Sequence, residues 1–409
     1  MSEAHSRRNV AAAVVLAALG YFVDIYDLIL FSIVRVASLK GIGVPDDQLL
    51  SQGLLLINMQ MGGMLVGGIL WGILGDKKGR LSVLFGSITV YSLANIANGF
   101  AHALPAYAAL RFIAGLGLAG ELGAGITLVS ELMPARTRGY GTMIVASVGI
   151  VGGVVAGLVG NWFGWRAAYF VGGGLGLALL LLRVGVFESG LFDRVKNAEV
   201  KRGDFLMLFS SRERLSKYAC CILLGVPVWY VIGILATFAP EFGRALLMPV
   251  APSASTSVMC LYAGCSLGGL ASGGVSQLLR SRRKAAFLFV SAAAALTVAY
   301  LNLPGLALAP FYAICFGLGF ATGYWAVFVT IASEQFGTNI RATVTTTVPN
   351  FVRGSLVAVS WAFAALKPGR GILGAAGLVG AACFALAFLS LLGLRETFGK
   401  DLDYLETHV

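Results

Sequence analysis

The chain has 409 residues, of which 58% are hydrophobic and only 12% are charged, and its formal net charge is +11. Soluble globular domains carry roughly 25% charged residues, so the composition excludes an ordinary soluble protein. The positive charge does not indicate nucleic-acid binding, because Lys and Arg gather in alternate loops between apolar runs, as they do in membrane proteins.

Apolar runs of about 20 residues, each long enough to cross a bilayer, follow one another along the chain. They predict an all-α membrane protein with twelve membrane-spanning helices, at 10–34, 50–74, 81–100, 105–130, 140–163, 166–186, 218–243, 255–279, 285–303, 306–333, 342–363 and 372–394. The longest polar stretch follows the sixth helix. It divides the chain into an N-terminal six-helix bundle at 1–186, a linker at 187–217, a C-terminal six-helix bundle at 218–394 and a tail at 395–409.

The distribution of basic residues predicts the orientation in the membrane. An even number of helices puts both termini on one side, and the loops on that side hold most of the Lys and Arg, including Arg7, Arg8 and the cluster at 194–217. Excess positive charge marks the cytoplasmic face, so both termini are expected in the cytoplasm. The first apolar run continues through Tyr21 to Val34, which predicts an uncleaved helix rather than a signal peptide. The short loops predict a bacterial inner membrane protein.

One segment occurs twice, about 203 residues apart. Five residue types recur in step, as Gly120, Thr127, Ser130, Glu131 and Arg138 in the first copy and as Gly323, Thr330, Ser333, Glu334 and Arg341 in the second. A ladder of glycines in the second helix also returns in the eighth, with Gly62, Gly63, Gly67 and Gly68 matched to Gly268, Gly269, Gly273 and Gly274. A duplicated membrane segment at half-length spacing is typical of a transporter built from two related halves.

Several motifs resemble those of the major facilitator superfamily. The end of the second helix resembles its loop motif, Gly-x-x-x-Asp-Arg-x-Gly-Arg. The matching residues are Gly72, Asp76, Gly79 and Arg80, and Lys77 stands in place of the usual Arg. The stretches 111–121, 131–139, 165–192 and 395–402 are similar to those of its metabolite:proton symporters and its sugar and organic-ion porters. The resemblance covers nearly the full length.

The resemblance implies two six-helix bundles that rock to expose a midplane site alternately to each side of the membrane. It also implies a gate on the cytoplasmic side. Asp76 can accept hydrogen bonds from a helix N-terminus in the other half and pair with arginines of the loops. The expected gating residues are Asp76, Arg80, Glu131, Arg138, Glu334 and Arg341.

Two carboxylates lie in the first apolar run, at Asp24 and Asp27, on one face of the predicted helix. An ionisable residue near the membrane midplane costs at least about 2.5–3.5 kcal/mol, so each needs a function or a partner. Neighbouring carboxylates disfavour each other's ionisation, which suits reversible proton binding. With Tyr26, they resemble the Glu-Trp-Tyr-Asp stretch of metabolite:proton symporters. The alternative is a structural ion pair with an arginine.

Arg353 lies midway along the eleventh predicted helix. A guanidinium can hold a carboxylate with two parallel hydrogen bonds, and a charged residue at about this place in the organic-ion porters implies binding of an anionic substrate. The alternative is a permanent partner for Asp24 or Asp27, and a substrate could compete for that pair.

The fourth helix carries two more charges, Arg111 and Glu121, for which roles in substrate binding and proton coupling are weighed against pairing between helices. Arg183, near the inner end of the sixth helix, is expected to extend toward the membrane surface. Other polar or aromatic side chains are candidates for substrate binding, with packing as the alternative: Tyr26, Gln60, Asn350, Tyr324, Trp325 and Tyr230.

These features predict a proton-coupled secondary transporter that imports a small organic anion, a carboxylate metabolite, by alternating access. Its expected partners are the substrate, the proton and the lipid bilayer, with no nucleic acid, and it is expected to be a monomer. No motif predicts an enzyme, a cofactor or a metal. One alternative is a proton-driven exporter of drugs or siderophores. Another is a membrane sensor or scaffold that transports nothing.

Overall fold

The computed structural model describes residues 3–78, 80–121, 138–188 and 208–399, and all regular elements in these ranges are helices. They are α1 (Glu3–Gly41), η1 (Asp46–Gln48), α2 (Leu49–Lys78), α3 (Arg80–Gly99), α4 (Leu104–Leu118), α6 (Arg138–Glu188), α8 (Arg212–Tyr230), η3 (Val231–Ala236), α9 (Ala239–Ala245), α10 (Ala254–Leu278), α11 (Arg282–Asn302), α12 (Leu308–Thr322), α13 (Trp325–Glu334), α14 (Thr338–Gly354) and α15 (Leu356–Gly393).

Two of these elements continue across a boundary between predicted helices. α6 turns at Gly164 (φ 77°) and α15 turns at Gly371 (φ 66°). Both lie in the left-handed region of backbone space, which glycine adopts without the steric cost that a Cβ imposes. The predicted boundaries at 163/166 and 363/372 are therefore one-residue breaks in otherwise continuous helical hydrogen bonding.

Other predicted helices are interrupted or shifted. The tenth is split between α12 and α13 at Gly323, and the eleventh is split between α14 and α15 at Ser355. The seventh consists of α8 and the π-helix η3, and it ends at Ala236 rather than at 243. The first continues to Gly41 instead of stopping at 34. α4 ends at Leu118, Glu121 is helical again after a short turn, and the predicted boundary at 130 lies outside the described residues.

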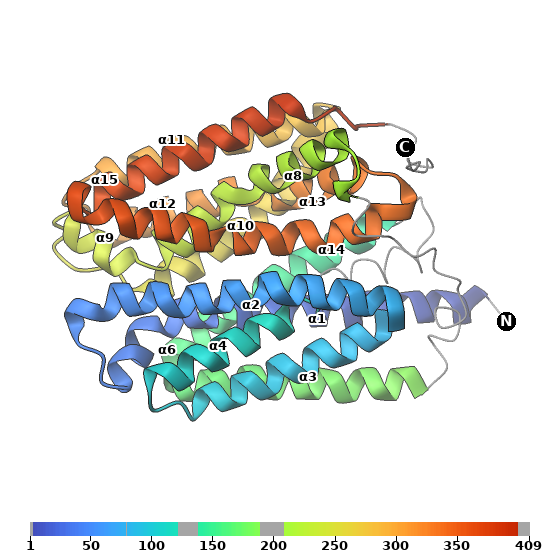
Figure 1. Ribbon diagram of the computed structural model, residues 1–409, viewed down its shortest axis with the longest axis horizontal. Coiled ribbons are helices and arrows are strands. Elements are labelled where there is room, and N and C mark those ends of the chain that lie inside the picture. The colour runs from blue at the N-terminus through green and yellow to red at the C-terminus, as the bar shows by residue number, and fades with distance from the viewer. Residues whose placement is uncertain (1–2, 79, 122–137, 189–207, 400–409) are drawn as a thin grey trace.

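The helices form two groups that lie side by side (Figure 1). The first half, α1 to α6, occupies the lower part of that view, and the second half, α8 to α15, occupies the upper part. The described ends of the chain lie at the same end of the bundle, here called the terminal end. α1 runs from there to the opposite end, here called the far end.

The same close packing of glycines occurs in both halves. Gly63 and Gly67 of α2 bring its backbone against that of α4 at Phe112 and Leu116. In the second half, Gly264 and Gly268 of α10 pack against the backbone of α12 at Phe316 and Phe320. A Cβ at any of the four would overlap the neighbouring helix, so only glycine allows this approach. The packing therefore matches Gly63 with Gly264, which lies five residues before Gly269, its match in the sequence.

The outer surface of the bundle is apolar. Large hydrophobic side chains such as Trp162, Phe163 and Trp361 are well exposed, while the polar residues Asp24, Asp27 and Arg111 are fully buried. Among the described residues, eight helices are long and apolar enough to cross a membrane. Apolar side chains on the outer surface and charged side chains in the interior are the arrangement expected of a chain surrounded by lipid.

Candidate functional site

A pair of opposite charges joins the two halves in the interior. Asp24 lies on α1 and Arg353 near the end of α14, and both side chains are fully buried. Arg353 Nη2 donates to Asp24 Oδ2 across 3.5 Å, which is long for a hydrogen bond between charged groups. Asp24 Oδ1 and the Nε and Nη1 atoms of Arg353 have no partner among the described residues. Most of the guanidinium's donors are therefore available to another acceptor.

Aromatic side chains surround this pair. Tyr21 of α1 and Tyr262 of α10 lie within electrostatic reach of both Arg353 and Asp24, and Trp325 lies beside Tyr21. Gly149 and Gly153 of α6 pack directly against the Tyr21 and Tyr262 rings. The sequence analysis singled out Trp325 but missed both tyrosines, because a tyrosine in an apolar helix is usually a packing residue. Three aromatic side chains therefore lie in the neighbourhood of a buried guanidinium.

A second buried charge cluster lies entirely within the first half. Asp27 and Arg111 interact electrostatically but form no direct ion pair among the described residues. Arg111 Nη1 instead donates to Tyr169 Oη at 3.5 Å, and the Tyr169 and Tyr107 hydroxyls are 2.7 Å apart. Both Asp27 oxygens, and Nε and Nη2 of Arg111, form no hydrogen bond of ordinary geometry with the described residues, although Asp27 lies near the Asn95 amide. Buried polar atoms normally have partners, so this cluster is poised to take up a proton or water.

The third buried pair, Glu121 with Arg183, corrects one expectation. Arg183 does not extend to the membrane surface; it is buried and bonds Glu121 through both ends of its guanidinium, with Nη1 donating to Oε2 at 3.0 Å. Gly20 of α1 packs against this ion pair, where a Cβ would overlap both side chains. The pair thus joins α6 to the segment just after α4 and leaves no room for a side chain at Gly20 of α1.

Five predicted substrate-binding residues use their side-chain donors within the protein. Each donates to a backbone carbonyl: Tyr26 to Ala168 at 3.0 Å, Gln60 to Leu28 at 3.1 Å, Asn350 to Ala119 at 2.8 Å, Tyr324 to Leu224 at 2.8 Å and Tyr230 to Ala376 at 2.8 Å. Asn350 joins the two halves by this bond, and its Oδ1 has no described partner. Tyr230 and Tyr324 instead bind within the second half. Substrate binding by these five residues stays a prediction.

At the far end, a charged contact that sequence reasoning missed joins the halves. Arg35 of α1 is fully buried, and its Nη2 donates to Glu241 Oε2 at 2.7 Å and to the carbonyl of Thr237 at 3.2 Å. Its guanidinium also lies over the Phe238 ring, 4.3 Å from the centroid. Thr237 follows the π-helix, where the helix breaks before α9. Arg35 therefore caps a broken helix of the opposite half, and only the break, invisible in the sequence, makes this capping possible.

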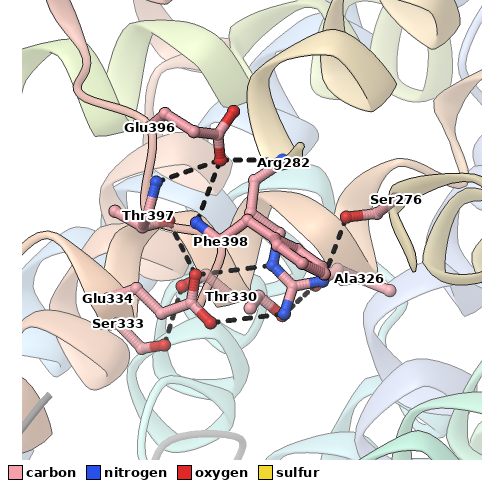
Figure 2. A network of polar contacts seen from close by, with 9 residues as sticks. All are labelled: Ser276, Arg282, Ala326, Thr330, Ser333, Glu334, Glu396, Thr397 and Phe398. Atoms are coloured by element: carbon pink, nitrogen blue, oxygen red, sulfur yellow. Dashed lines mark hydrogen bonds and ion pairs between the residues drawn. The ribbon is translucent and has the colours of Figure 1, made fainter. Parts of the chain in front are cut away.

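Glu334, predicted to be a gating residue, belongs to a polar network at the terminal end of the second half (Figure 2). Arg282 at the start of α11 pairs with Glu334 at 3.4 Å, and the Thr397 hydroxyl donates to Glu334 Oε2 at 2.7 Å. Glu396 accepts hydrogen bonds from the backbone N–H groups of Arg282, at 2.9 Å, and Phe398, at 3.0 Å. The network fastens the segment after α15 to the first turn of α11.

Arg341 lies close to this network, where its Nε donates to the carbonyl of Ser333 at 3.0 Å. The remaining predicted gating residues cannot be placed in the same way. Glu131 lies outside the described residues, and for Asp76, Arg80 and Arg138 only the backbone is described, at the ends of α2, α3 and α6.

The family model of the Major Facilitator Superfamily matches residues 10–360. The chain therefore belongs to this superfamily, and its fold is the superfamily's arrangement of twelve membrane-spanning helices in two pseudo-symmetric six-helix bundles. The crystal structure of a D-xylose-proton symporter superposes with a TM-score of 0.69 at 17% identity and covers 98% of this chain and 100% of that one. At this identity the likeness supports the fold alone.

Three relatives are transporters by name. The niacin transporter of Acinetobacter baylyi is 42% identical over 115 residues, 27% of this chain, so the match spans only about a quarter (26%) of that protein. A protein of Cupriavidus pinatubonensis named "Probable 4-methylmuconolactone transporter" is 27% identical over 94% of this chain and 90% of its own length. The 3-(3-hydroxy-phenyl)propionate transporter of Escherichia coli is 29% identical over 72% of this chain and 74% of its own.

Proposed function

We propose that this member of the Major Facilitator Superfamily is a proton-coupled secondary transporter that imports a small organic anion by alternating access, with an aromatic carboxylate as its preferred cargo. The observation that carries the proposal is Arg353. It is fully buried, lies between the two halves, and is held by one long contact to Asp24. A buried guanidinium with unused donors is the group best suited to hold a carboxylate in two-pronged fashion.

The chemistry of the cargo follows from what surrounds Arg353. Tyr21 and Tyr262 lie in the electrostatic field of the guanidinium and Trp325 lies beside Tyr21, so a flat ring attached to the carboxylate would have aromatic side chains nearby to pack against, which favour it over an aliphatic acid. Two of the three relatives are named for compounds of this kind, because niacin and 3-(3-hydroxyphenyl)propionate are both aromatic carboxylates.

The Arg353–Asp24 pair links anion binding to proton uptake. When a substrate carboxylate takes the guanidinium, Asp24 loses its only described partner while it remains buried. An unpaired buried carboxylate is costly, and protonation removes that cost. Anion and proton therefore stabilise each other's binding, as symport requires. Asp27, three residues along the same face of α1, is the second acceptor for the proton, and Glu121 is a third candidate, although Arg183 holds it as an ion pair.

The proposed orientation rests on the charge of the loops. The terminal end carries most of the basic residues and would face the cytoplasm of a bacterial cell, with the far end facing outward and the chain acting as a monomer in its inner membrane. A cysteine reagent that cannot cross the membrane should then label a single cysteine at Lys367 from outside and one at Arg395 only after lysis, with the native cysteines replaced.

Uptake into proteoliposomes tests the function. With an acidic exterior, purified protein should accumulate radiolabelled benzoate, nicotinate or 3-(3-hydroxyphenyl)propionate, and uptake should acidify the lumen. Nicotinamide, which has the same ring without the charge, should be transported far more slowly than nicotinate. Equal transport of nicotinate and nicotinamide would overturn the anion assignment. Uptake at a rate that does not depend on the pH gradient would overturn proton coupling. Efflux driven by proton entry would favour the alternative function of a proton-driven exporter.

A further inference from the structure

A line of buried polar groups runs through the interior of the first half along one face of α6. After the turn at Gly164, the residues Tyr169, Gly172, Gly176 and Arg183 follow at spacings of three, four and seven, so all four share one face of the helix. At 1.5 Å per residue this face is about 21 Å long, which is most of the thickness of a bilayer core. It faces α1, α3 and the end of α4.

Each position along this face meets a polar side chain from another helix. Tyr169 contacts Arg111, as described above. A Cβ at Gly172 would overlap the Asp27 carboxylate, and a Cβ at Gly176 would overlap Ser92 Oγ, with the ring of Tyr91 close by. At the terminal end of the face, Arg183 bonds Glu121. The glycines thus leave space for polar side chains that a larger residue would displace.

The polar atoms in the middle of this line form no hydrogen bond of ordinary geometry with the described residues, although the Asn95 amide lies near enough to Asp27 to interact with its carboxylate. They are both oxygens of Asp27, both amide atoms of Asn95, Ser92 Oγ and Tyr91 Oη, and all four side chains are fully buried. Buried polar groups without a protein partner bind internal water, and an internal water needs two to four such groups. Gly172 and Gly176 are one turn apart, so the Asp27 and Ser92 oxygens beside them lie within the span of one or two waters.

The position of Tyr91 extends the line from Asp27 to Glu121. Its backbone packs against Gly117 at the end of α4, and its hydroxyl lies in the fields of Glu121, Asp27, Arg183 and Asp24. Serine and tyrosine hydroxyls both donate and accept hydrogen bonds, which is what a proton relay requires of its members. The charged groups that face this line are thus Asp24 and Asp27 of α1, Arg111 and Glu121 of the α4 segment, and Arg183 of α6.

We infer that Tyr91, Ser92 and Asn95 hold a chain of water inside the first half, through which Asp27 exchanges its proton with Glu121 and the terminal end. The inference rests on the proposed proton coupling and adds the route that the proton takes through the protein. This route is separate from the interface between the halves where Arg353 lies, so the proton and the anion leave by different ways. Tyr91 and Ser92 act as positioning residues, because they order the water and do not contact the anion.

Hydroxyl-radical footprinting of the purified full-length protein tests for the water without any transport substrate. Radicals formed from internal water should oxidise Tyr91 several-fold faster than Tyr300, which is equally buried but donates its hydroxyl to Leu235 at 2.9 Å. Gly176→Ala should slow the oxidation of Tyr91, because its methyl group overlaps Ser92. Gly174→Ala is the matched control, since Gly174 lies two residues away with nothing within 4 Å. Oxidation of Tyr91 no faster than that of Tyr300 would overturn the inference.

Proton movement in proteoliposomes tests the relay. Tyr91→Phe and Gly176→Ala should slow nicotinate-driven acidification of the lumen by about tenfold or more, which is less than removal of a proton-transfer group costs, because both changes only disturb the order of the water. Both should keep nicotinate counterflow, which needs no net proton transfer, within about twofold of wild type. Tyr300→Phe and Gly174→Ala should change neither rate. If Gly176→Ala does not fold, Ser92→Ala takes its place.

The outcomes separate this inference from the proposed function. Wild-type uptake of nicotinate with proton movement, unchanged in Tyr91→Phe and Gly176→Ala, would overturn the relay and leave proton-coupled import standing. Uptake without proton movement in the wild type would overturn the coupling itself, and the water chain would then be no proton route even if Tyr91 is oxidised rapidly. Loss of counterflow in Tyr91→Phe would also count against the relay, because it would place Tyr91 in the anion step.

Discussion

The two halves share a fold and a repeated sequence but place their charges differently. In the first half, Asp24, Asp27, Arg111, Glu121 and Arg183 are all buried in the interior. In the second half, the described interior holds one charge near the middle, Arg353, and the acidic residues lie near the ends of helices. The difference is sharpest at repeated positions, where Glu121 corresponds to Tyr324 and Arg111 to Ile314.

This difference indicates a division of labour within one duplicated fold. The hydroxyls of Tyr230, Tyr300 and Tyr324 in the second half all donate to backbone carbonyls, so they stabilise the packing and leave few polar atoms free. The first half instead keeps several buried polar atoms that have no partner in the part of the chain that the structure describes. The first half is thus suited to proton movement, and the second presents a single cation to an anionic substrate.

The largest expected effect of a substitution is on the Glu121–Arg183 pair. Breaking a buried ion pair by removing one partner costs about 3–5 kcal/mol, because the other charge stays buried without compensation. Glu121→Gln should therefore lower the melting temperature strongly. Adding Arg183→Met should recover most of the loss, since replacing both charges is often nearly neutral. Tyr324→Phe, at the repeated position, should cost only about 1 kcal/mol. Equal losses for Glu121→Gln and Tyr324→Phe would contradict the contrast between the halves.

Arg353 offers the next largest effect. If it binds the anion, Arg353→Lys keeps the charge but loses the two-pronged geometry, and Arg353→Ala should weaken nicotinate binding by about 100-fold or more. A purely structural role predicts that Arg353→Ala leaves Asp24 unpaired, and that Asp24→Asn then restores both melting and binding. Thermal-shift and binding measurements on the single and double variants decide between the two. Normal nicotinate binding by the double variant would exclude Arg353 as the anion site.

A smaller effect is expected at the far end, where Arg35 of the first half binds Glu241 of the second. A hydrogen bond between charged groups contributes about 1.5–3 kcal/mol, so Glu241→Gln should shift the population toward separation of the halves at this end by about tenfold. Labelling of a cysteine at the buried Ser255, which contacts Gly157 across the halves, should speed up accordingly. Lys40→Gln is the control, because its pair with Asp46 is exposed. Unchanged labelling in Glu241→Gln would show that Arg35 does not hold this end closed.

The sequence predicted the fold well because each apolar run must be long enough to cross a bilayer and the repeat marks two halves. It also selected Asp24, Asp27, Arg353 and Glu121 as candidates, because a charge inside an apolar helix stands out. The sequence did not show which acidic residue pairs with which basic residue. Arg183 was expected at the membrane surface because its partner, Glu121, is 62 residues away in sequence, and only the packing of α6 against the end of α4 brings them together.

Other features of the site depend on backbone breaks that leave no sequence pattern. The bond from Arg35 to the Thr237 carbonyl exists because the π-helix η3 ends there, and nothing in the apolar stretch from Val231 predicts a π-helix. Tyr91, Ser92 and Asn95 were missed for a different reason. Each is an ordinary residue of a membrane helix, and only the absence of side chains at Gly172 and Gly176 shows that these polar groups face one another.

The smallest expected effect on stability is that of replacing Glu396, an acidic residue at the terminal end of the second half. Burial alone would raise the pKa of Glu396, but hydrogen bonds from the Ser281 hydroxyl and from backbone N–H groups at the start of α11 outweigh burial and lower its pKa to about 2. A carboxylate at a helix N-terminus is also favoured by the helix dipole.

Because the folded-state pKa lies below the ordinary value of 4.5, the contribution of Glu396 to stability is fully present above about pH 5. It is lost progressively as the pH falls toward 2. Glu396→Gln should therefore melt slightly below wild type at pH 7 and at pH 5, and the gap should narrow at pH 3. Hydrogen exchange at the first turn of α11 should follow the same trend. Glu213→Gln should show a smaller change of the gap over the same pH range, because the Glu213 side chain is exposed and solvent screens its pairs with Lys217 and Arg395. A gap that stays constant from pH 7 to pH 3 would mean that the side chain stabilises this end by packing, and that its charge contributes nothing.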